Sequence, residues 1–123
     1  MKKILFIEDE TALQKTLGEV LKQEKYEILA AFNGEDGLVL AKEQKPDLIL
    51  LDLILPKIDG FEVLRQLKKD PETEDIPVIV LTNLEASENI GQVIELGATT
   101  YLVKAQYSLQ ELTEKVKKTL GEE

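Results

Sequence analysis

The sequence predicts an α/β fold in which five parallel strands form one sheet with helices on both of its faces. Apolar segments alternate with amphipathic helical patterns five times within 123 residues, an order that is typical of parallel strands joined by helical crossovers. One of those segments, Leu48–Leu51, is apolar at every position, as expected for a central strand covered on both faces. This length suits one domain, so we expect a single domain over residues 1–123.

The first strand is expected over Ile4–Ile7, and apolar residues at helical spacing predict a helix over Thr11–Lys25. Thr11 and Gln14 have the spacing of a capping box, which predicts that their side chains close the start of this helix. A second strand is expected over Tyr26–Phe32, where the apolar character returns.

A second helix is expected over Glu35–Lys45, and it must end there because Pro46 cannot continue it. After the apolar third strand, Asp59 is expected to cap a third helix with its side-chain oxygen. That helix is expected to end at Asp70-Pro71, since proline again breaks the helical pattern.

The fourth strand is expected over Pro77–Leu81, followed by a weaker helical pattern over Ser87–Leu96. The fifth strand is expected over Thr100–Val103. Ser108 and Glu111 then have the spacing of a second capping box, which predicts the start of the last helix.

Polar residues follow four of these strands at the point where each strand ends. Five such units favour a flavodoxin-like three-layer open sandwich with the strand order 2-1-3-4-5, in which ligands bind beyond the carboxyl ends of the strands. The carboxyl ends of parallel strands share one rim, so these distant residues are expected to meet there. In chain order they are Glu8, Asp9, Asp52, Thr82, Asn83 and Lys104.

The three acids at this rim would repel one another unless a cation lay between them. They offer only oxygen ligands, which favour a hard ion such as Mg²⁺ or Ca²⁺, and a small ligand set with room for water favours Mg²⁺. An ionised Asp52 beside the metal would be a nucleophile toward phosphorus, giving an aspartyl phosphate. Lys104 would offset charge on the phosphoryl oxygens, and the Thr82 hydroxyl would add a hydrogen bond.

The segment from Asp52 to Gly60, Asp-Leu-Ile-Leu-Pro-Lys-Ile-Asp-Gly, resembles the acceptor strand and loop of the response-regulator receiver domain (CheY-like), the phosphoacceptor module of two-component signalling. The resemblance extends over essentially the whole chain. It implies that Asp52 accepts the phosphoryl group. It also implies that Asp9, Asp52 and the backbone carbonyl of Ile54 bind Mg²⁺, and that Glu8 acts on the metal through water.

The resemblance further implies a conformational switch in which Thr82 supplies the hydroxyl, Tyr101 the aromatic ring and Lys104 the lysine. It implies a histidine kinase or a histidine phosphotransfer protein as the donor in trans. Output would pass to a downstream protein target through a face made by the fourth helix, the fifth strand and the fifth helix. We expect no enzyme activity beyond self-catalysed phosphoryl transfer and dephosphorylation at Asp52.

Two positions depart from the family pattern. Asn83 stands beside the phosphoryl pocket where a small residue, commonly Ala, is usual, and Ala105 follows Lys104 where Pro is usual. The Lys-Pro bond of the family is often cis, but a cis bond without proline costs ~2.5–4 kcal/mol. We therefore expect a trans bond between Lys104 and Ala105 and a differently shaped loop as far as Ser108.

Two other functions stay open. A phosphorylation-independent adaptor with the receiver fold is mildly favoured by Asn83 and Ala105, and disfavoured by the intact set of acids, hydroxyl and lysine. A phosphatase with an aspartate nucleophile is less favoured, since such enzymes typically carry a second Asp two residues after the nucleophile. This chain has Ile54 at that position.

Composition excludes several further classes. The absence of Cys excludes thiol catalysis and disulfides, and the absence of His excludes histidine acid–base catalysis and a phosphohistidine on this chain. A net charge of −9 argues against direct contact with nucleic acid. No apolar stretch approaches the ~20 residues that cross a bilayer, and no signal-peptide cleavage site follows the first strand, so we expect a cytoplasmic protein with no membrane partner.

Overall fold

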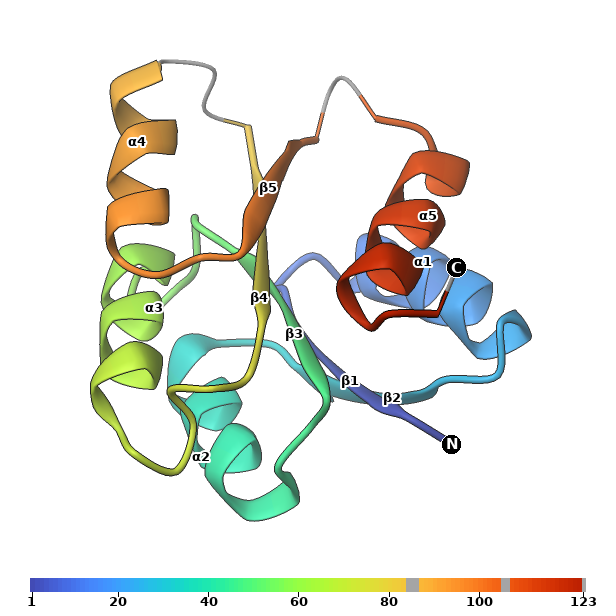
Figure 1. Cartoon of the computed structure of the whole chain (residues 1–123), viewed down its shortest axis with the longest axis horizontal. Coiled ribbons are helices and arrows are strands. Elements are labelled where there is room, and N and C mark those ends of the chain that lie inside the picture. Colours follow the sequence, from blue (N-terminus) through green and yellow to red (C-terminus); the bar gives the residue numbers. More distant parts are fainter. Residues whose placement is uncertain (84–86, 105–106, 123) are drawn as a thin grey trace.

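The computed structural model describes residues 1–83, 87–104 and 107–122. Its five strands form one parallel sheet in the order β2-β1-β3-β4-β5, which confirms the predicted fold class and strand order (Figure 1). The strands are β1 Lys3–Ile7, β2 Glu27–Ala31, β3 Leu48–Asp52, β4 Val78–Thr82 and β5 Thr100–Val103. The helices are α1 Thr11–Gln23, α2 Gly34–Gln44, α3 Gly60–Lys69, α4 Ser87–Glu95 and α5 Leu109–Thr119.

The sheet separates two hydrophobic cores. In Figure 1, α1 and α5 lie on one side of the sheet, and α2, α3 and α4 lie on the other. Successive side chains of a strand point to opposite faces, so neighbouring residues of β1 and β3 enter different cores. Leu5, Ile7, Ile49 and Leu51 pack with residues of α2, α3 and α4. Ile4, Phe6, Leu48 and Leu50 pack with residues of α1 and α5.

The capping box predicted at Thr11 and Gln14 is wrong. α1 does begin at Thr11, but its N-cap is Glu10, whose side chain makes no capping hydrogen bond. Gln14 is instead buried, and its amide donates to backbone carbonyls of the sheet. Spacing alone does not distinguish a capping glutamine from an inward-facing one. The second capping box, at Ser108 and Glu111, is confirmed.

The chain leaves β3 along a path that only glycine permits at residue 60. The Asp59 side chain accepts a hydrogen bond from the Glu62 N–H at 3.0 Å, which confirms Asp59 as the cap of α3. The Gly60 N–H donates to the Leu53 carbonyl at 2.8 Å. A Cβ on Gly60 would lie 2.4 Å from the Asp52 carbonyl oxygen, so the start of α3 lies directly against the backbone that carries Asp52.

Two further expectations concern the loop after β5 and the helices. The trans bond expected between Lys104 and Ala105, and the loop that begins there, fall outside the described residues. Among the helices in the described ranges, none has both the length and the apolar character needed to cross a bilayer.

Candidate functional site

The register of the central strands places Glu8 beside Asp52. Ile7 pairs with Leu51 across β1 and β3, so the residues that follow them come to the same level of the rim. Farther along the rim, Thr82 is paired with the last residue of β5, and Lys104 comes next. The Lys104 N–H donates to the Thr82 carbonyl at 2.7 Å. Parallel pairing therefore gathers side chains that are far apart in the sequence.

Three carboxylates form a cluster at this rim. Each of Glu8, Asp9 and Asp52 offers one carboxylate oxygen within 4.8 Å of the other two. Glu8 and Asp52 are buried, whereas Asp9 is exposed and gives the cluster an open side toward solvent. An all-oxygen set with an open side suits Mg²⁺, which keeps part of its water shell. The residues present therefore fit a magnesium ion.

Lys104 joins two of these acids. Its Nζ lies 2.6 Å from Glu8 Oε1 and 3.1 Å from Asp52 Oδ2. The Lys104 side chain is only 14% exposed, so both contacts are largely screened from water. Sequence reasoning placed Lys104 at the rim to act on a phosphoryl group, but it did not foresee the pairing with Glu8.

The charges of this cluster perturb one another. Burial raises the pKa of the Glu8 carboxyl to about 7, although hydrogen bonds from Lys104 and the Glu10 N–H favour its ionised form. Burial of the Lys104 amine opposes its charge, but the contacts with Glu8 and Asp52 outweigh that effect and raise its pKa. Three acids against one amine leave a surplus of negative charge, which attracts a divalent cation.

Backbone N–H groups orient both buried acids. The Glu10 N–H donates to Glu8 Oε2 at 3.1 Å, and the Ile54 N–H donates to Asp52 Oδ1 at 3.2 Å. Asp52 is therefore held through one oxygen by the loop after β3 and through the other by Lys104. Ile54 itself is a hydrophobic residue that is 58% exposed, two residues after Asp52.

Thr82 and Tyr101, the residues expected to form the conformational switch, lie on the face of the sheet that is covered by α2, α3 and α4. Thr82 is buried at the end of β4 and alternates in step with Val78 and Val80, which enter the core beside α3 and α4. Tyr101 is partly buried and packs against that same core. Asn83 follows Thr82 at the rim and is exposed. The structure therefore gathers Glu8, Asp9, Asp52 and Lys104 at the rim. Their roles, and those of Thr82, Asn83 and Tyr101, stay predictions.

A model of the response regulator receiver domain family matches residues 4–117, which is nearly the whole chain. The chain belongs to this family. Receiver domains belong to two-component systems and interact with histidine kinases or phosphotransfer proteins. The matched range includes the acid cluster, Thr82 and Lys104.

Solved structures of receiver domains are similar to the structure of this chain. A CheY-like receiver domain protein from Methanospirillum hungatei superimposes with a TM-score of 0.91 at 30% identity, covering 99% of this chain and 95% of that one. The receiver domain of a sensor histidine kinase from Pseudomonas aeruginosa, with a magnesium ion coordinated in its active-site cleft, superimposes with a TM-score of 0.87 at 25% identity, covering 98% of each chain. Magnesium binding thus occurs in a receiver domain of this fold.

A curated relative is longer than this receiver domain. The transcriptional regulator RpaA of Synechocystis is 38% identical over 120 residues, which are 98% of this chain but 49% of RpaA. The chain therefore spans about half the length of that regulator.

Proposed function

We propose that this receiver domain takes a phosphoryl group onto Asp52 from a phosphohistidine of a partner protein. One Asp52 carboxylate oxygen forms a bond to phosphorus while the bond between phosphorus and the imidazole nitrogen breaks. The electron pair stays on that nitrogen, which takes up a proton. The observation that carries the proposal is the position of Asp52, buried in the acid cluster with Lys104 Nζ 3.1 Å from one of its oxygens.

Mg²⁺ bound by Asp9, Asp52 and the Ile54 carbonyl, with Glu8 acting through water, would supply positive charge opposite the phosphoryl oxygens. Lys104 is already beside Asp52 and supplies a second positive charge without a large movement. The hydroxyl of Thr82 completes the set as a hydrogen-bond donor to the transferred group. Asn83 follows Thr82 and is exposed, and in this proposal its amide affects access to the acceptor.

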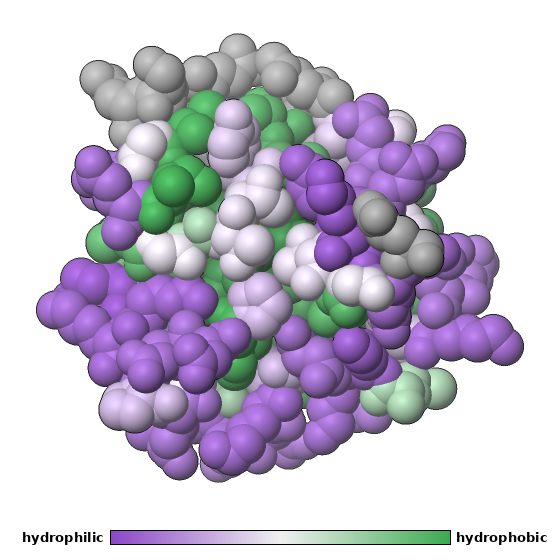
Figure 2. All heavy atoms as spheres, in the orientation of Figure 1, coloured by the Kyte–Doolittle hydropathy of each residue, from purple (hydrophilic) through white to green (hydrophobic). Residues whose placement is uncertain are grey.

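The phosphoryl group adds about −1.5 to −2 charges at the rim and brings new acceptor oxygens, to which the Thr82 hydroxyl can donate a hydrogen bond. We propose that Thr82 and Tyr101 carry this change to a surface made by α4, β5 and α5, where a downstream protein binds. Ile94 on α4 and Leu109 on α5 are exposed hydrophobic residues of this surface. Figure 2 shows hydrophobic residues over and beside α4 in the upper part of the view, and hydrophilic residues over the lower part.

Phosphorylation by a small-molecule donor tests the proposal directly. The protein is incubated with acetyl phosphate and Mg²⁺, and its intact mass is measured. We expect one added phosphoryl group in the wild type and in Asp75→Asn, an exposed aspartate that serves as the matched control. Asp52→Asn should gain none. Equal labelling of Asp52→Asn and the wild type would overturn the assignment of Asp52 as the acceptor. If no protein is labelled, and if a partner protein binds equally well with and without a chelator of Mg²⁺, the phosphorylation-independent adaptor is favoured instead.

The phosphatase alternative is disfavoured by the residue two positions after Asp52. Ile54 has a hydrocarbon side chain and cannot act as the general acid of such enzymes. Sustained release of phosphate from a small phosphoester over many turnovers, lost in Asp52→Asn, would restore that alternative.

A further inference from the structure

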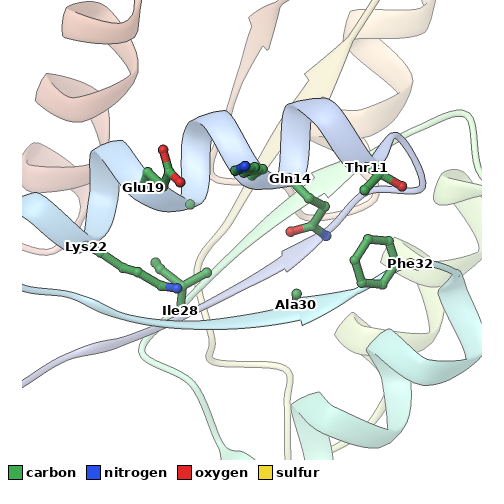
Figure 3. A pocket seen from close by; sticks show the side chains of 9 residues that line it. Thr11, Gln14, Glu19, Lys22, Ile28, Ala30 and Phe32 are labelled. Atoms are coloured by element: carbon green, nitrogen blue, oxygen red, sulfur yellow. The ribbon is translucent and has the colours of Figure 1, made fainter.

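Gln14 takes no part in the proposed chemistry, yet it contacts the turn that carries two of the acids. Its side chain is 6% exposed and extends from α1 toward the strands beneath it (Figure 3). Its Nε2 lies 2.8 Å from the Phe6 carbonyl oxygen, 3.1 Å from that of Glu8 and 2.9 Å from that of Ala31. An amide nitrogen has two protons, so these three acceptors share them.

The Phe6 carbonyl is in β1, just before the turn Glu8-Asp9-Glu10, the Glu8 carbonyl is in the turn itself, and the Ala31 carbonyl is at the end of β2. The Ala31 carbonyl also accepts the Glu8 N–H at 2.9 Å, so Gln14 and the first residue of the turn share one acceptor on β2. The Glu8 carboxylate in turn accepts the Glu10 N–H at 3.1 Å. The backbone of Glu8 is therefore held by Gln14, and its side chain is held by the residue that ends the turn.

At the end of the turn, where α1 begins, the usual side-chain cap of the helix is missing. Glu10 is the N-cap of α1, but its side chain makes no capping hydrogen bond. A capping side chain normally stabilises the entry into a helix by about 1 kcal/mol. In this chain the side chain that ties the helix to the preceding turn comes instead from Gln14, within the helix itself.

We propose that Gln14 is a positioning residue for the Mg²⁺ site. By holding the Glu8 carbonyl, its amide fixes the peptide between Glu8 and Asp9, and hence the directions in which their two carboxylates leave the backbone. Residues behind the ligands of a metal commonly tune its affinity in this way. The inference rests on the proposed role of Asp9 and Glu8 in binding Mg²⁺.

The surroundings of Gln14 allow a clean test. It lines a hollow between α1 and β2, together with Lys15, Lys22 and Ile28, so side chains of similar length have room (Figure 3). Gln14→Met keeps the length of the side chain and removes the hydrogen-bond donor. Gln66→Met is the matched control, because the Gln66 amide donates to a Glu62 carboxylate on α3 and not to the acidic turn.

The readout is the dissociation constant of Mg²⁺ alone, measured by calorimetry on folded protein, beside the free energy of unfolding in urea. We expect Gln14→Met to weaken Mg²⁺ binding by about tenfold, a typical effect of losing a residue behind a metal ligand. Gln66→Met should bind nearly as the wild type does. A purely structural role would lower stability in Gln14→Met and leave the dissociation constant unchanged, which would overturn the inference.

If Gln14→Met does not fold, Gln14→Asn replaces it, because its amide is one methylene too short to reach all three carbonyls. Weaker binding by that variant supports the inference, and unchanged binding overturns it. Failure of the wild type to bind Mg²⁺ would overturn the proposed function as well. Equal binding by the wild type and the Gln14 variants would overturn this inference alone.

Discussion

Lys104 Nζ lies nearer to Glu8 than to Asp52, at 2.6 Å against 3.1 Å, although Lys104 and Glu8 are 96 residues apart in the chain. The amine thus neutralises the buried acid that faces the proposed phosphoacceptor. Its contact with Asp52 keeps it close to the place where a phosphoryl group would form. We therefore expect the same lysine to contribute to stability before phosphorylation and, in the proposed function, to charge balance after it.

Replacing Lys104 by Met should leave Glu8 and Asp52 facing each other without a cation. We expect the free energy of unfolding to fall by about 2 kcal/mol, less than the ~3–5 kcal/mol of a fully buried pair, because Glu8 can take up a proton. Added Mg²⁺ should restore part of the loss. Urea unfolding with and without Mg²⁺ measures both effects.

The matched control is Lys117→Met, which removes a partly exposed pair with Glu24. Surface pairs contribute about 0–1 kcal/mol, so its effect should stay within that range. A loss in Lys104→Met no larger than in this control would contradict the stabilising role of the buried contact.

Asp9→Asn should separate metal binding from stability. Asp9 is exposed, so its replacement should change the free energy of unfolding by no more than about 0.5 kcal/mol. Its carboxylate belongs to the cluster, however, and we expect Mg²⁺ affinity to fall by more than about tenfold. Glu10→Gln removes the adjacent exposed acid outside the cluster and should bind Mg²⁺ almost normally. Similar affinities for the two variants would remove Asp9 from the ligand set.

Gly60→Ala should destabilise the protein by about 1–3 kcal/mol, the usual cost of overpacking, because the added methyl would overlap the backbone at Asp52 and Leu53. The matched substitution is Gly91→Ala in α4, where a Cβ meets no atom of the described residues within 4 Å. That change should be neutral or stabilising by up to about 1 kcal/mol. Thermal unfolding of both variants distinguishes the two sites, and equal melting temperatures would contradict the close approach.

The proposed role of the Thr82 hydroxyl can be tested with two variants, each of which differs from threonine in one group. Thr82→Ser keeps the hydroxyl, and Thr82→Val keeps the shape without it. With beryllofluoride and Mg²⁺ as a phosphoryl mimic, NMR signals of Tyr101 should shift in the wild type and in Thr82→Ser. They should shift far less in Thr82→Val. A full shift in Thr82→Val would show that the signal does not pass through the hydroxyl.

Patterns within single elements predicted the fold well. The apolar run of β3 and the breaks at Pro46 and Asp70-Pro71 are local signals, and the structure places the elements accordingly. The rim was predictable for a related reason: once strands are parallel, residues after their carboxyl ends must converge. Asp52 and Lys104 could be named as neighbours on that basis.

Partners of individual side chains were less predictable. The spacing of Thr11 and Gln14 fits a capping box, but Gln14 finds better acceptors in carbonyls that only the folded sheet brings beneath it. In the same way, the contact between Lys104 and Glu8 depends on how four strands, β1, β3, β4 and β5, align. The close fit of Gly60 against Asp52 is likewise a property of tertiary packing, whereas the sequence shows only a helix start.

The alternation of side chains along the strands has a consequence for signalling. Glu8 and Asp52 continue the series that faces α1 and α5, whereas Thr82 and Tyr101 belong to the series that faces α3 and α4. The hydrogen-bonded backbone of the sheet thus separates the carboxylates of Glu8 and Asp52 from the ring of Tyr101. If Thr82 and Tyr101 act as the proposed switch, the signal has to pass from one face of the sheet to the other, and we expect it to do so at Thr82, the last residue of β4.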